Sequence, residues 1–208
     1  MIIDSLKLFW NHFLDPSFKD VELFDREIKK GEFIVINWLL MMVKTFYIIF
    51  FTYLGAKAPE FLTELSGAKA PVMLESFNVS LQKISIFITL LEVVIFPIAF
   101  YFLYKLWVMM LIFFAEVFEY EKDDLKKACR QVIKRSYSAN FLFLLPFVGG
   151  GLSVLLQGLY LYLGMKGRLN FTNLQALLVL MVPLVILGCL AILLISYLFF
   201  IFSLFFGS

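Results

Sequence analysis

Histidine and recognisable catalytic motifs are scarce in this chain, and their scarcity limits its chemistry. The only histidine is His12, so one chain cannot assemble a histidine-based metal site or a Ser-His catalytic arrangement. The segment from Gly149 to Ser153 does not match the Gly-x-Ser-x-Gly nucleophile elbow, and no phosphate-binding Gly-x-x-x-x-Gly-Lys motif is present. We therefore expect no catalytic residues, no metal site and no cofactor.

Charged residues and cysteines are also few. Charged residues make up 16% of the chain and the formal net charge is +2, which argues against nucleic acid as a partner. Of the two cysteines, Cys129 lies in a basic polar segment and Cys189 lies in an apolar run. We expect these two thiols at different depths, and hence no disulfide bond.

Apolar residues are abundant and gather in long runs. They form 62% of the chain, and the mean hydropathy is +0.92, whereas an ordinary globular domain has about 45–50% apolar residues. About 20 apolar residues in a helix cross a hydrocarbon layer, and the runs 33–54, 84–103 and 174–206 are of that order or longer. The sequence therefore predicts an integral membrane protein. We expect no removed signal peptide, because no basic leader precedes an apolar stretch at the start.

Residues 1–31 predict a cytoplasmic region of short amphipathic helices. Apolar residues recur at helical spacing up to Asp15-Pro16, which should end the first helix. A second short helix is expected from Ser17 to near Gly31. These helices either cover the ends of the bundle or dock on the membrane surface or a partner. The expected contact face is Leu6, Phe9, Trp10 and Phe13.

Residues 32–208 are predicted to form the transmembrane domain. After the first span, Gly55-Ala56-Lys57-Ala58-Pro59 recurs word for word at residues 67–71, and we expect a loop there with a short helical piece between the copies. The second span should start near Ile84, kink at Pro97 and continue towards Phe118, with Lys105 marking its emergence from the membrane.

A charged segment, 119–135, follows the second span, acidic first and basic later, as suits a helix dipole. We expect a solvated helix whose basic stripe could also bind anionic lipid head groups. The stripe consists of Lys126, Lys127, Arg130, Lys134 and Arg135.

Residues 139–164 are ambiguous because Pro146 and the triple glycine 149–151 interrupt them: they form either one broken span or two short spans. If these residues form two spans, thirteen Lys and Arg residues lie on the side of the N-terminus and three lie on the other side. If they form one span, the numbers are eleven and five. The positive-inside rule favours five spans with a cytoplasmic N-terminus. The expected fold is thus an all-α polytopic bundle of about five spans.

Two ionisable residues, Lys44 and Glu92, interrupt the first two spans. Charged side chains at mid-bilayer are costly and indicate function by default. Counted from the ends of their spans, the two lie at similar depth in adjacent antiparallel helices, so we expect an intramembrane ion pair.

Several short motifs together resemble the Yip1-domain family. They are the amphipathic opening that ends on Asp15-Pro16-Ser17-Phe18, the segment Ser136-Tyr137-Ser138-Ala139, the run 145–150 (Leu-Pro-Phe-Val-Gly-Gly), and an apolar helix that ends in Gly164-Met165-Lys166. The resemblance covers nearly the whole chain in order. It implies five spans and a cytoplasmic N-terminus. Eukaryotic members act in early secretory-pathway membrane traffic by binding small GTPases and one another, and they carry a long acidic or Pro-rich cytoplasmic arm. That arm has no counterpart in the roughly 30 residues that precede the first span, which argues against a GTPase partner and favours a bacterial inner-membrane protein.

Two functions follow as hypotheses from these patterns. The first is a non-enzymatic subunit or organiser of a larger inner-membrane assembly, whose partners are the lipid bilayer, other membrane proteins or a second copy, and anionic lipid. The alternative is a small transporter, channel or lipid-translocating component in which Lys44 and Glu92 face a water-filled path.

Overall fold

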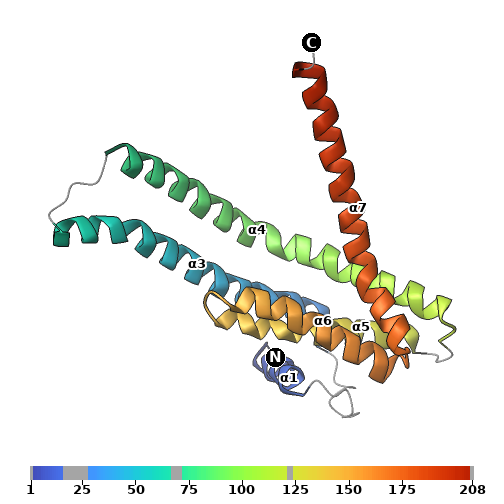
Figure 1. Cartoon of the computed structure of the whole chain (residues 1–208). Helices are drawn as coiled ribbons and strands as arrows, with labels where there is room; N and C mark the ends of the chain where they lie inside the picture. The colour runs from blue at the N-terminus through green and yellow to red at the C-terminus, as the bar shows by residue number, and fades with distance from the viewer. Residues whose placement is uncertain (1, 16–27, 67–71, 121–123, 207–208) are drawn as a thin grey trace.

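The computed structural model describes residues 2–15, 28–66, 72–120 and 124–206, and these residues form an all-helical protein (Figure 1). The predicted all-α fold class is confirmed. The helices are α1 (Ile2–Leu14), α3 (Lys30–Ser66), α4 (Val72–Val117), α5 (Leu125–Ser136), the 3₁₀ helix η1 (Tyr137–Leu144), α6 (Gly149–Arg168) and α7 (Asn173–Phe206). Helix α1 ends at Leu14, immediately before Asp15-Pro16, as predicted. The second amphipathic helix, predicted from residue 17, falls largely outside the described residues.

Helices α3 and α4 run antiparallel in a register fixed by two side-chain contacts. The Lys30 ammonium donates to the Tyr101 hydroxyl at 3.1 Å, and the Trp38 indole N–H donates to the Val93 carbonyl at 2.9 Å. Both helices are longer than predicted. The loop expected at residues 55–59 is helical, and α3 continues to Ser66, although Gly55 and Pro59 disfavour a helix interior. The second copy of the repeat, 67–71, lies outside the described residues.

Residues 125–168 form a helical hairpin. Helix α5 continues directly into η1, the chain turns over residues 145–148, and α6 returns. The turn depends on Gly149, where an added Cβ would lie 1.9 Å from the Leu142 carbonyl oxygen. The tip of the hairpin lies beside α3, with the Phe147 and Phe51 rings 4.4 Å apart between centroids.

In the described part of the chain, three helices are long and apolar enough to cross a membrane, over Lys30–Gly55, Lys83–Val117 and Asn173–Phe202. Residues 139–164 do not add a helix of this kind, because they are divided between η1 and α6 and because glycine, serine and glutamine dilute the apolar character of α6. The finer expectation of five spans therefore rests on the distribution of charge and on the depth of the hairpin.

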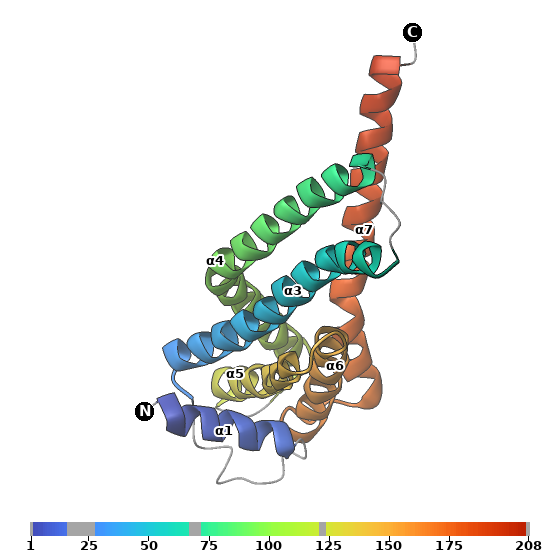
Figure 2. The same cartoon turned by 90° about the vertical axis from the view of Figure 1, so that its left-hand side faces the viewer.

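The buried core lies where α1, the start of α3, the second half of α4 and the hairpin meet (Figure 2). Helix α7 joins this core only through its first turns, where Ala176 and Val179 are fully buried. Beyond Pro183 it rises away from the other helices (Figure 1). The molecule thus has a dense end, which includes the N-terminal helix, and an open end.

Candidate functional site

The predicted contact face of α1 divides into a buried and an exposed part. Phe9 is fully buried, with its ring 5.3 Å from that of Phe141 and 6.1 Å from that of Phe33. Trp10 packs edge-on against Phe141 at 5.0 Å but is 43% exposed, and Leu6 is 40% exposed. Phe13 is half-buried beside the same Phe141 ring. The face therefore attaches α1 to the bundle and keeps an apolar outer edge.

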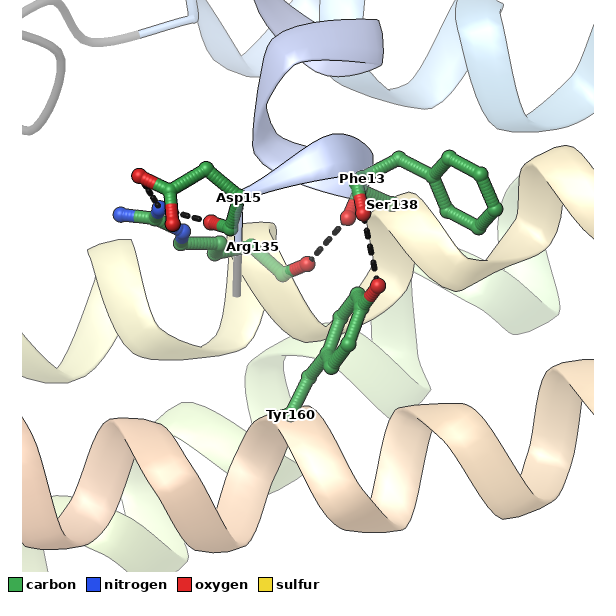
Figure 3. Close-up of polar contacts among 5 residues, drawn as sticks. All are labelled: Phe13, Asp15, Arg135, Ser138 and Tyr160. Carbon is green, nitrogen blue, oxygen red and sulfur yellow. Dashed lines mark hydrogen bonds and ion pairs between the residues drawn. The ribbon is translucent and has the colours of Figure 1, made fainter. Parts of the chain in front are cut away.

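Polar contacts hold the C-terminal end of α1 on the hairpin (Figure 3). The Arg135 guanidinium, 1% exposed, donates to the Asp15 carbonyl oxygen, and it lies 3.6 Å from the Asp15 carboxylate. The Tyr160 hydroxyl of α6 donates to the Phe13 carbonyl at 2.7 Å. Because the last carbonyls of a helix have no partner inside the helix, these donors satisfy groups that would otherwise need water.

The basic stripe of the hairpin is not solvated along its whole length. Lys126, Lys127 and Arg130 are exposed on α5, as expected. Lys134 and Arg135 are buried, which corrects the expectation of a solvated helix for this end of the segment. The physical reason is that both reach backbone carbonyls near the ends of neighbouring helices: the Lys134 ammonium donates to the Ile28 carbonyl at 2.7 Å.

A chain of amides and a hydroxyl lies inside the bundle and joins α3, η1 and α6. The Asn140 amide nitrogen donates to the Asn37 side-chain oxygen at 2.6 Å, and the Ser153 hydroxyl donates to the Asn140 side-chain oxygen at 2.8 Å. The Gln157 amide donates to the same Asn140 oxygen, and the Asn37 amide donates to the Phe33 carbonyl at 2.9 Å. Asn37, Asn140 and Ser153 are buried. We call Asn37, Asn140, Ser153 and Gln157 the amide network.

The amide network is suited to positioning helices. Asn37 lies seven residues after Lys30, about 10 Å along α3, so the network sits inside the apolar part of the bundle. None of its four members changes protonation near neutral pH, and their polar atoms bond to one another. Such interhelical hydrogen bonds fix which faces of membrane helices meet. The network can therefore fix the register of α3, η1 and α6 against one another, but its side chains are not suited to act as an acid, a base or a nucleophile.

Sequence reasoning missed Asn140 and Ser153. One signal could have found Ser153: it lies four residues before Gln157, which places two polar side chains on one face of an apolar helix. Asn140 stands next to the turn of the hairpin in a segment with no helical periodicity, and only the tertiary structure reveals its partners.

Lys44 and Glu92 do not meet in the structure. The Lys44 ammonium lies 5.1 Å from the centre of the Phe143 ring, beside the hairpin tip, whereas Glu92 is exposed on α4. The expected ion pair does not form because the α3–α4 register differs from the one inferred from span ends: with Trp38 beside Val93, Glu92 lies opposite Leu39, five residues before Lys44.

Metal and thiol chemistry find no support within the described residues. No group of three or more His, Cys, Asp and Glu side chains there could hold a metal ion. Cys129 is fully buried on α5, and burial, with a smaller contribution from the charge of Glu116, raises the pKa of its thiol to about 12. A neutral, enclosed thiol is a poor nucleophile.

Comparison of this chain with protein-family models, with curated proteins and with solved structures gives no match. Any functional conclusion therefore rests on the residues and their arrangement.

Proposed function

We propose that this chain is a non-enzymatic, Yip1-like integral membrane protein that serves as a subunit or organiser of a larger assembly in a bacterial inner membrane. The single observation that carries the proposal is the position of Glu92. This acidic side chain is exposed on the outside of α4 among exposed apolar neighbours, Ile88, Leu91 and Ile95. It lies opposite Leu39, about 14 Å along α3 from Lys30, and therefore near the middle of a hydrocarbon layer about 30 Å thick.

An acidic side chain that faces lipid at this depth is costly, and acidic residues in spans almost always face protein or water instead. A helix of a partner protein or of a second copy that covers this face of α4 would remove the cost. The open arrangement of the helices is compatible with such a partner, because only 6% of the residues in the apolar stretch of α4, and likewise of α7, are buried.

The transport alternative is less well supported. It requires Lys44 and Glu92 to face one path, but Lys44 points to the hairpin tip and Glu92 is exposed on α4. The amide network, which could have lined a path, bonds to itself.

Site-specific photo-crosslinking in cells tests the proposal. Ile88, 58% exposed, lies one turn before Glu92 on the same face of α4. Val94, 70% exposed, lies at a depth similar to that of Glu92 on nearly the opposite face. A benzophenone amino acid at position 88 should give a discrete protein adduct that weakens when Glu92→Gln is added, and position 94 should give none. Absence of any protein adduct at position 88, or equal adducts at both positions, would contradict the proposal.

Five spans with a cytoplasmic N-terminus belong to the same proposal. The charge count supports them, and so does the depth of the hairpin, whose tip at Phe147 packs on Phe51. Phe51 lies 18 residues beyond Phe33, about 27 Å along α3, and Phe33 contacts α1. The 3₁₀ form of η1, with a rise of about 2 Å per residue, helps a short segment to cover this distance.

Cysteine labelling distinguishes the topologies. In a Cys189→Ser background, Lys57→Cys and Phe147→Cys should react with an impermeant maleimide from outside the cell, and Gly167→Cys only after lysis. Cys129 should stay silent, because its pKa of about 12 keeps the thiol protonated. If Phe147→Cys is protected from outside, the hairpin does not cross and three spans remain; external labelling of Gly167→Cys would indicate one broken span.

A further inference from the structure

A cavity of about 600 Å³ lies between the start of α3, the second half of α4 and α5. Its most distinctive property is charge, because cationic side chains from three regions of the chain converge on it. They are Lys29, Lys30, Lys105, Lys126, Arg130 and Lys134. Over the part of the chain that the structure describes, no acidic side chain lines this cavity. We call it the basic cavity.

The cations of the basic cavity are held in different ways. Lys30 is engaged by Tyr101, whose ring centre lies 4.1 Å from the ammonium, and Lys134 donates to the Ile28 carbonyl. Lys105, Lys126 and Arg130 are exposed around the cavity. Like charges in one concavity repel one another, and the potential that they create attracts an anion.

One wall of the basic cavity is apolar. Val108, Met109 and Ile112 of α4 line it. On the membrane side of the cavity, two apolar residues on the same face of α4 as Lys105, Ile98 and Phe102, are 62% and 63% exposed. The cavity therefore combines a cationic mouth with a hydrocarbon surface, at the place where α3 enters its apolar stretch at Lys30. A free inorganic anion would contact only the cationic mouth and would not use the apolar wall.

We propose that the basic cavity binds the phosphate of an anionic phospholipid, with an acyl chain along the apolar face of α4. Arg130 supplies a fork of donors that matches phosphate oxygens, and the lysines supply point charges around it. The predicted basic stripe contributes only part of this site, because Lys30 is the first residue of α3, Lys29 directly precedes it and Lys105 comes from α4. The inference does not depend on the proposed assembly or on Glu92.

Thermal stability with defined lipids tests this inference on the full chain in a neutral detergent. Addition of phosphatidylglycerol should raise the melting temperature more than phosphatidylcholine does, since a ligand that binds only the folded state stabilises it. The triple variant Lys105→Gln, Lys126→Gln, Arg130→Gln should weaken the apparent affinity for phosphatidylglycerol by at least about tenfold, because each basic residue near an anionic lipid contributes roughly a fivefold factor. The matched control is Lys83→Gln, Lys127→Gln, Lys166→Gln, which removes three exposed lysines outside the cavity and should bind normally.

Three outcomes would overturn the proposal. One is equal affinity in the triple variant and the wild type. Another is equal loss in the control variant, which would indicate binding by net charge alone. The third is stabilisation by inorganic phosphate that equals that of phosphatidylglycerol, which would make the cavity a site for a free anion. If the triple variant does not fold, Lys105→Glu alone provides the test, and retention of phosphatidylglycerol is then measured by native mass spectrometry. Unchanged retention in that variant contradicts the proposal.

Discussion

The two ends of this molecule are built on different principles. Near the N-terminus, α1, the start of α3 and the hairpin enclose aromatic rings, two buried cations and the amide network. At the other end the helices separate, and side chains of α7 such as Leu193 and Phe199 are 65% and 77% exposed. In the apolar stretch of α3, 33% of the residues are buried, whereas only 6% are buried in the corresponding stretch of α4 and of α7.

The difference indicates where specificity resides. In a membrane, apolar side chains gain little by leaving lipid for protein, so packing and interhelical hydrogen bonds decide which helices meet. The dense end has both, and it fixes the register of α3 against the hairpin. The open end presents apolar surface to lipid or to a partner. Substitutions at the dense end should therefore change the stability of the chain, and substitutions at the open end should change its association.

The largest effect is expected at Phe9, which joins α1 to the dense end. Phe9→Ala removes a fully buried ring that contacts Phe33 and Phe141, and it should lower the free energy of unfolding by about 3 kcal/mol. Leu6→Ala on the same helix, where the side chain is 40% exposed, should cost less than about 1 kcal/mol. Titration with SDS followed by tryptophan fluorescence measures both. Equal effects would mean that α1 does not dock through Phe9.

The next effect concerns the amide network. Asn140→Leu leaves Asn37, Ser153 and Gln157 without their shared partner, and it should cost about 2 kcal/mol, since each buried polar group left unsatisfied costs about 1–3 kcal/mol and the three can partly bond to one another. Asn11→Leu, an amide on the exposed side of α1, provides the control in the same titration. A cost below about 0.5 kcal/mol would show that the network does not hold the helices together.

Some of this arrangement could be predicted from the sequence, and some could not. The end of α1 at Asp15-Pro16 and the apolar spans follow from local patterns. The relative depths of Lys44 and Glu92 could not be predicted in this way. Counting residues from the ends of the apolar runs assumes that each helix ends where its apolar run ends, but α3 continues to Ser66. Within the candidate site, Phe9 could be predicted from helical spacing. The burial of Arg135 could not, because it depends on where another helix presents its last carbonyls.

The triple glycine, predicted as a break, allows a sharper comparison within three residues. Gly149→Ala should cost about 2 kcal/mol, because the new Cβ would lie 1.9 Å from the Leu142 carbonyl oxygen and the turn must open. Gly151→Ala should be neutral or stabilising by up to about 1 kcal/mol, since nothing lies within 4 Å of its added Cβ and alanine favours helix. The same SDS titration measures both variants. If the two alanines behave alike, the close approach at the hairpin turn is not a constraint.

The smallest expected effect is the coupling between Lys44 and Glu92. The contacts of Lys30 with Tyr101 and of Trp38 with Val93 place Lys44 opposite Phe87, five residues or about 7–8 Å from Glu92 along α4. Lys44 turns instead to the Phe143 ring, and Glu92 turns outwards. In a double-mutant cycle of Lys44→Met and Glu92→Gln, measured on the purified chain in detergent, the two effects should add within about 0.3–0.5 kcal/mol. A coupling above about 1 kcal/mol would instead support an ion pair across the two helices. Additivity in the purified chain, together with loss of the crosslink at position 88 in cells for Glu92→Gln alone, would place the role of Glu92 at the contact with a partner, because only the assembly would then sense its charge.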